Sequence, residues 1–231
     1  MFRQMVQRIS AQVPSRCLVC HAWPAQTVCE ACVQSFAQPV ARCSTCALSV
    51  PSGVHQCGAC LTNAPPVERA LAAVAYDYPW SALIGQFKFQ QDPGLARTFA
   101  QMMRSAPWIE PALEAADYVI PIPLSIQRLK SRGYNQSLVL ALELESRKTI
   151  PHLLLRIKDT PPQSTLHRDE RLESVKNAFA VDPLRTAQLQ GKKVVLLDDV
   201  MTSGASMHSA ARALRQAGAA HITAMVFART D

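Results

Sequence analysis

The 231-residue sequence contains no cysteine after residue 60, only 8 glycines and only 6% aromatic residues. So few glycines exclude a collagen-like chain, in which every third residue is glycine. The sequence also lacks an uninterrupted apolar run of the ~18 residues that a membrane-spanning helix requires. Its first ten residues, MFRQMVQRIS, do not form the apolar block of a secretory signal peptide. We therefore expect a globular, cytoplasmic protein with no transmembrane segment.

Positive charge is in excess, with 24 Lys and Arg against 17 Asp and Glu and a net charge of +7 at pH 7. This balance favours polyanionic partners such as nucleic acid or phosphorylated metabolites. Solubility alone also accounts for a modest positive charge, so the position of the charge matters more than its sum. On a prior of about 100–200 residues per domain, the length predicts one domain with a small appendage.

The eight cysteines form four C-x2-C pairs, which are Cys17 and Cys20, Cys29 and Cys32, Cys43 and Cys46, and Cys57 and Cys60. Each pair holds two thiolates on one tight turn, so two pairs complete a four-cysteine zinc site with no open coordination position. The sequence therefore predicts two structural zinc sites. Gaps of 8, 10 and 10 residues between the pairs favour consecutive pairing, and an interleaved arrangement is the alternative.

Two other uses of these cysteines fit less well. A disulfide framework requires an oxidising compartment and a signal peptide. A thioredoxin-like redox centre uses one C-x-x-C after a strand, whereas this chain has four copies in a loop-rich stretch. A segment of this size with few aliphatic residues buries little core, so metal binding must supply most of its folding free energy.

A domain boundary is expected at Pro65 and Pro66, where two prolines block regular structure and the cysteines have ended. This divides the chain into a double zinc ribbon at residues 1–66 and a second domain at residues 67–231. The second domain alternates between apolar runs and helical patterns, which is typical of an α/β fold. Strands are expected at 71–76, 118–123, 194–199 and 221–228, and helices at 80–103 (broken at 92–94), 136–147 and 206–217. The apolar run 153–157 precedes a polar stretch, 158–176, which we expect to be mobile.

The segment 194–206, VVLLDDVMTSGAS, predicts a phosphate site. Its aliphatic run is typical of a strand buried on both faces of a parallel sheet, and it ends in Asp198 and Asp199. The following turn leads into a helix N-terminus, where free backbone amides and hydroxyls bind phosphate. Adjacent carboxylates suit sugar hydroxyls or Mg²⁺, so together the acids and loop indicate a ribose phosphate. The Walker pattern and the dinucleotide fingerprint are absent, and a turn cap with a solvated acid is the plainer alternative.

This segment resembles the motif by which type I phosphoribosyltransferases bind 5-phosphoribosyl-1-pyrophosphate (PRPP). The whole chain resembles the ComF family, including the GntX-type proteins, in which a double zinc ribbon precedes a phosphoribosyltransferase domain. Further matching segments are LIGQFKF at 83–89, PIPLSIQRLKSRGYNQS at 121–137, PQSTLHRDER at 162–171, 177–179 and 227–230. The resemblance implies an α/β fold with a type I phosphoribosyltransferase-like parallel sheet and helices on both faces.

The resemblance also implies residue roles. Asp198 and Asp199 would bind the ribose hydroxyls of PRPP, with Mg²⁺ accompanying the ligand. The 5′-phosphate loop would comprise Thr202, Ser203, Gly204, Ala205 and Ser206. The pyrophosphate side would comprise Pro121, Ile122, Pro123, Arg128 and Arg132, with Lys88 assisting. A solvated basic turn is the alternative for the arginines, and no residue is assigned as a general acid or base.

For function, the resemblance implies a protein that binds PRPP and Mg²⁺ and acts in uptake or use of single-stranded DNA, as in natural transformation. One alternative is an active nucleobase-type phosphoribosyltransferase, a glycosyltransferase that displaces pyrophosphate from PRPP in nucleotide salvage. No element that recognises a base is evident in the sequence, so activity as an enzyme is left open. A second alternative is a non-catalytic scaffold that binds membrane DNA-import proteins. The low aromatic content weakens the case for a dedicated single-strand binder, because such proteins stack bases on aromatic rings.

Overall fold

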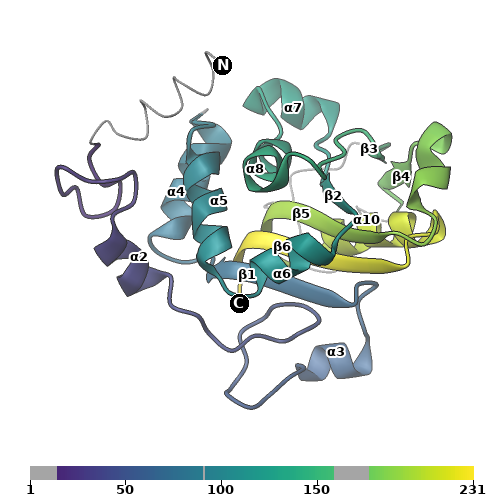
Figure 1. Ribbon diagram of the computed structural model, residues 1–231, viewed down its shortest axis with the longest axis horizontal. Helices are drawn as coiled ribbons and strands as arrows, with labels where there is room; N and C mark the ends of the chain where they lie inside the picture. The colour runs from purple at the N-terminus through teal and green to yellow at the C-terminus, as the bar shows by residue number, and fades with distance from the viewer. Residues whose placement is uncertain (1–14, 91, 159–176) are drawn as a thin grey trace. The chain divides into compact units, whose positions relative to one another are not determined.

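The computed structural model describes residues 15–90, 92–158 and 177–231 (Figure 1). The chain divides into two compact units, Met1–Gln38 and Pro39–Asp231. The boundary expected from the prolines at 65 and 66 thus lies inside the larger unit. Hydrogen bonds account for this, because the amide of Ala70 in the sheet donates to the carbonyl oxygen of Ser44 at 2.9 Å. The polar stretch expected to be mobile, 158–176, lies almost wholly outside the described residues.

Each unit contains one small cysteine-rich element. In the first unit a bridge pairs Ser15 with Ala25, and helix α2 (Glu30–Phe36) begins after Cys29. In the second unit a bridge pairs Arg42 with Ser49, and helix α3 (Gly58–Thr62) begins after Cys57. The two elements therefore share one plan, a bridged turn followed by a short helix.

The larger unit is built on a four-stranded parallel sheet in the order β1-β6-β5-β2. Its strands are β1 (Arg69–Ala75), β2 (Tyr118–Pro121), β5 (Lys193–Met201) and β6 (His221–Arg229). Because all four are parallel, their carboxyl ends meet at one edge of the sheet. Helix α10 (Ala205–Gln216) connects β5 to β6, which confirms the predicted βαβ unit.

Helices cover both faces of the sheet, as the sequence predicts. Successive strand side chains point to opposite faces. On one face Leu196 packs in a cluster with Leu214 of α10. On the other face Phe227 stacks on Phe99 with ring centroids 4.1 Å apart. Figure 1 shows the helices of this second face, α4 (Trp80–Phe89), α5 (Leu95–Ser105), α6 (Ile109–Ala115) and α8 (Gln136–Glu145).

The remaining elements are short. Helix α7 (Ile126–Arg132) follows β2, and β3 (Leu154–Arg156) pairs antiparallel with β4 (Phe179–Val181). A 3₁₀ helix, η2, spans Pro183–Leu189. Within the described part of the chain, no helix has both the length and the hydrophobicity that a bilayer span requires.

Candidate phosphate site and metal centres

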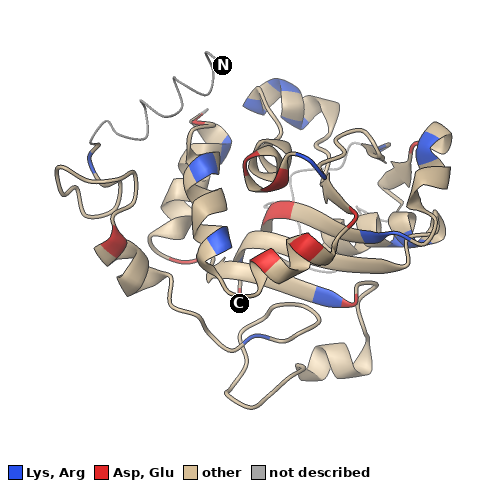
Figure 2. Cartoon of the chain, viewed as in Figure 1, with Lys and Arg blue, Asp and Glu red and all other residues tan. Residues whose placement is uncertain are grey.

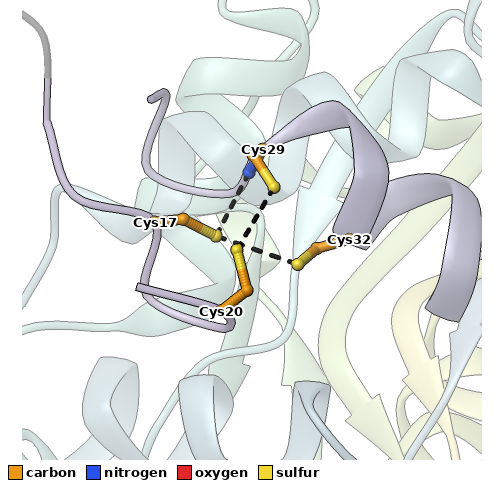
Figure 3. Close-up of side chains that lie close together, drawn as sticks. All are labelled: Cys17, Cys20, Cys29 and Cys32. Carbon is orange, nitrogen blue, oxygen red and sulfur yellow. Dashed lines mark hydrogen bonds between the residues drawn. The ribbon is translucent and has the colours of Figure 1, made fainter. Parts of the chain in front are cut away.

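The first cysteine group brings the sulfur atoms of Cys17, Cys20, Cys29 and Cys32 within 4.8 Å of one another (Figure 3). The Sγ atoms of Cys17 and Cys32 are 3.9 Å apart, and those of Cys20 and Cys29 are 3.6 Å apart. A tetrahedron with Zn–S bonds of about 2.3 Å has sulfur–sulfur edges of about 3.8 Å. The four thiols therefore fit a tetrahedral metal site.

The sulfur atoms of the second group, Cys43, Cys46, Cys57 and Cys60, also lie within 4.8 Å of one another. The Sγ atoms of Cys46 and Cys57 are 3.6 Å apart, and the amide of Cys57 donates to Sγ of Cys43 at 3.3 Å. Burial alone would raise the pKa of Cys43, but backbone amides of Cys57, Thr45 and Cys46 lower it to about 6. The thiolate is the metal-binding form, so these amides favour a bound cation. The structure groups the cysteines consecutively, as their spacing favours.

The acidic pair directly follows the buried aliphatic run 194–197 of β5 (Figure 2). Oδ1 of Asp198 accepts hydrogen bonds from the Ser137 hydroxyl at 2.6 Å and from the amide of Asp199 at 2.9 Å. Asp199 is 5% exposed, and its Oδ2 lies 3.0 Å from Nζ of Lys88 on α4. Burial, followed by the charge of Asp199, raises the pKa of Asp198 to about 6, against the hydrogen bond from Ser137 and the charge of Lys88. One lysine thus faces two carboxylates, which leaves net negative charge for a further cation.

The loop after β5 turns sharply at Gly204, which has a φ of +77° and precedes α10. A hollow of about 30 Å³ lies in this turn, lined in part by Asp198, Thr202, Gly204, Ala205 and Ser206. A side chain at position 204 would place its Cβ 2.8 Å from the His208 ring, so a residue other than glycine would displace this ring as well as strain the backbone. Ser203 differs from its neighbours, because its hydroxyl accepts from the Ala205 amide at 3.4 Å and the residue lines another cavity.

The expected pyrophosphate side begins where β2 ends. The amide of Ile122 donates to the carbonyl oxygen of Leu197 at 2.9 Å, which holds this turn beside the acidic end of β5. Asn135 supports the same turn, because its Nδ2 donates to the carbonyl oxygen of Ile122 at 3.0 Å. Its Oδ1 accepts from the amide of Ser137 and so caps α8.

The basic residues expected here divide into two sets. Lys88 contacts the acidic pair through Asp199, whereas the resemblance implies a role for it on the pyrophosphate side. Arg132 ends the basic helix α7 (Figure 2), donates to Oε1 of Gln136 at 3.0 Å, and lies 5.3 Å from the centre of the Phe89 ring. Arg128 lies in the first turn of α7, where its amide donates to the Ser125 hydroxyl at 3.3 Å. Sequence reasoning missed Ser137, although it directly follows the Asn-Gln pair of the quoted motif.

Comparison with known proteins shows which family this chain resembles. The sequence pattern of the phosphoribosyl transferase domain matches residues 121–231. Competence protein F of Haemophilus influenzae is 33% identical over 162 residues, which cover 67% of this chain and 69% of that protein. The chain belongs to the ComF family of competence proteins. Two further relatives extend the match. DNA utilization protein YhgH of Salmonella typhimurium is 28% identical over 227 residues, 94% of this chain and 98% of that protein. Competence protein ComFC of Bacillus subtilis is 31% identical over 137 residues, 59% of this chain and 54% of that protein.

The domain match in this ComF protein begins at Pro121 and includes the β2 turn, the acidic pair and the loop before α10. Lys88 and both cysteine groups lie before it. The ComF chain therefore adds two elements to the matched domain: a lysine that pairs with the site's carboxylate and two four-cysteine centres.

Proposed function

We propose that this ComF-family protein binds PRPP with Mg²⁺ at the loop 198–206 and acts in the uptake or use of single-stranded DNA. The observation that carries the proposal is the juxtaposition of the acidic end of β5 with the glycine turn at the start of α10. A helix N-terminus with free amides favours a phosphate, and carboxylates accept hydrogen bonds from vicinal hydroxyls. A ribose 5-phosphate satisfies both requirements.

In this arrangement the 5′-phosphate would bind the amides and hydroxyls of the 202–206 loop, and the ribose hydroxyls would face Asp198 and Asp199. The pyrophosphate would extend toward the Pro121–Pro123 turn. Mg²⁺ is a hard cation that takes oxygen ligands and usually binds through one or two carboxylates together with substrate phosphates. The unbalanced carboxylate charge beside Lys88 supports such an ion, which would offset charge on the pyrophosphate.

We further propose that zinc occupies both cysteine groups. The sulfur separations of 3.6 and 3.9 Å support this, since they are close to the edge expected for a Zn–S tetrahedron. Four thiolates leave no open coordination position, so the role of each metal would be structural. Backbone amides already donate to one sulfur of each group, Cys17 in the first and Cys43 in the second, which favours the thiolate form that binds metal.

The names of the relatives support a role with DNA, because they comprise competence proteins and DNA utilization proteins. Charge supports it as well: residues 1–66 contain four arginines and one acidic residue. Neutralisation of phosphates supplies most nonspecific affinity for DNA. We therefore expect single-strand binding that weakens steeply with salt and depends on the arginines of this region.

The proposal is tested by calorimetry with PRPP and Mg²⁺. Wild-type protein should bind, and the double variant Asp198→Asn, Asp199→Asn should lose binding. The matched control is Asp117→Asn, which changes an exposed carboxylate that pairs with Lys192, and it should bind as the wild type does. Absence of binding to wild-type protein would refute the PRPP site.

A second assay separates binding from transfer. Release of pyrophosphate from PRPP with a nucleobase would identify an active transferase. Single-stranded DNA binding should also be measured. If it survives the double aspartate variant but is lost when Arg16 and Arg42 are replaced, DNA binds the cysteine-rich elements and not the acidic pair.

A further inference from the structure

Arg229 connects the second cysteine group to the phosphate loop. It lies at the end of β6 and is 5% exposed. Its Nε donates to the carbonyl oxygen of Cys46 at 2.9 Å, and its Nη1 donates to the carbonyl oxygens of Met201 (3.0 Å) and Thr202. One buried guanidinium thus contacts a cysteine of the metal site and the first residues of the loop.

A cavity of about 280 Å³ lies beside this connection. Its walls include Cys46 and Cys60 on the ribbon and Ser203, Gly204 and His208 on the loop and α10. The second cysteine-rich element and the loop are therefore separated in part by this cavity. Arg229, which also lines the cavity, contacts both of them. Other bonds, such as Ser49 to Asp231, join the ribbon to the chain end and not to the loop.

We propose that Arg229 is a positioning residue that makes the conformation of the phosphate loop depend on the metal in the second cysteine group. Metal binding fixes the turn that contains Cys43 and Cys46, because a thiolate site folds with its ion. The carbonyl oxygen of Cys46 is then held where Nε of Arg229 can reach it. Without metal this acceptor moves, and a buried guanidinium left with an unsatisfied donor reorganises its remaining bonds. These include the bonds to Met201 and Thr202 at the start of the loop, besides those to Thr230.

The inference rests on the proposed function only for its effect on ligand affinity. The metal of the second group should increase the affinity of the loop for PRPP, and the metal of the first group should not. Without any ligand, the loop amides should exchange hydrogen more slowly when the second group holds its metal, and the metal of the first group should not change this rate.

The chain offers a matched pair of ligand variants. Cys29 and Cys57 both precede the short helix of their ribbon, and both are half-buried. Cys57→Ser should lower PRPP affinity about tenfold, the effect of losing one charged hydrogen bond, and should increase hydrogen exchange of residues 201–206. Cys29→Ser should change neither.

A second pair tests the guanidinium. Arg229→Lys retains the charge but loses the planar set of donors that reaches several carbonyls. It should reproduce the effect of Cys57→Ser, and the two changes together should add little to either alone. Arg215→Lys is the control, because Arg215 also donates to backbone carbonyls, those of Ala219 and Ala220, away from the loop.

Coupling between two sites is reciprocal. In Cys29→Ser protein loaded with Co²⁺ at the second group, PRPP should therefore change the absorption spectrum of the metal, and Arg229→Lys should abolish that change. Equal effects of Cys29→Ser and Cys57→Ser, or loop exchange that is indifferent to metal and to Arg229→Lys, would overturn the inference. Failure of wild-type protein to bind PRPP would refute the proposed ligand alone, because hydrogen exchange still tests the connection.

Discussion

The ammonium of Lys88 lies 3.0 Å from Oδ2 of Asp199, and both side chains are largely buried. Removing one partner of a buried ion pair leaves an uncompensated charge, which costs about 3–5 kcal/mol. We expect Lys88→Gln to lower the free energy of unfolding by about this amount in urea titrations. Adding Asp199→Asn should restore part of the loss, since Asp198 is then the one carboxylate of the pair that is left without the charge of Lys88.

The control for this prediction is Lys192→Gln. Lys192 pairs with Asp117 at 3.3 Å on the surface, where solvent screens the interaction. We expect this change to leave the urea midpoint nearly unaltered. If Lys88→Gln and Lys192→Gln lower the free energy of unfolding equally, Lys88 does not stabilise the charged form of Asp199 as we infer.

Gly204→Ala should impair both stability and ligand binding. A left-handed conformation costs a non-glycine residue roughly 1–2 kcal/mol, and at position 204 the new methyl group would also meet the His208 ring at 2.8 Å. Gly191→Ala separates these two causes, because Gly191 has a φ of +70° but no atom within 4 Å of its Cβ position. The Gly204 variant should unfold at a lower temperature than the Gly191 variant, and only the former should lose PRPP affinity in calorimetry.

The titration of Asp198 should occur near pH 6, well above that of an ordinary aspartate. Burial and the charge of Asp199 cause this shift. Because the folded-state pKa exceeds the unfolded value, the folded protein binds more protons, and the contribution of this group to stability falls as the pH rises from about 4 to about 6. Carbon-13 NMR of the carboxyl group in the protein alone would measure the midpoint. Ser137→Ala should move the midpoint upward, since it removes a hydroxyl donor from the charged form. An unchanged midpoint in that variant would contradict the assigned cause.

Removal of metal should unfold the two cysteine-rich elements and preserve the sheet. Neither element has enough buried apolar surface to remain folded alone. Under strong chelation we expect fast hydrogen exchange at residues 17–32 and 43–60, with slow exchange retained in β5 and β6. Elemental analysis should confirm that the metal has been removed. If hydrogen exchange in either element is still slow in that metal-free protein, the prediction is wrong.

Much of the fold could be predicted from the sequence because local pattern and tertiary context agree. The aliphatic run of β5 is buried on both faces, Gly204 adopts the positive φ that its turn permits, and the break in the helical pattern at 92–94 separates α4 from α5. The spacing also predicted that consecutive C-x2-C pairs share a metal site, because the short segment between them is enough to bring the two turns together.

Other elements had no comparable signal. Helix α7 contains no buried residue, because its two large apolar side chains, Ile126 and Leu129, are exposed and the rest of the helix is polar. Helix α6 contains Pro111 and buries only Ile109 and Leu113. The ion pair of Lys88 with Asp199 depends on α4 packing beside the end of β5, which no local pattern specifies. The attachment of the second cysteine element to the sheet arises likewise from single contacts, such as that of Arg229 with Cys46.

The position of β6 affects how the chain folds during its synthesis. This last strand lies between β1 and β5, and in the four-stranded sheet β1 pairs with β6 alone. A nascent chain therefore cannot close its sheet until residues 221–229 have left the ribosome, and until then the backbone of β1 is open to pairing with other chains. Without β6, β1 would have no partner in this sheet, and the pair of β5 with β2 would remain as a separate piece.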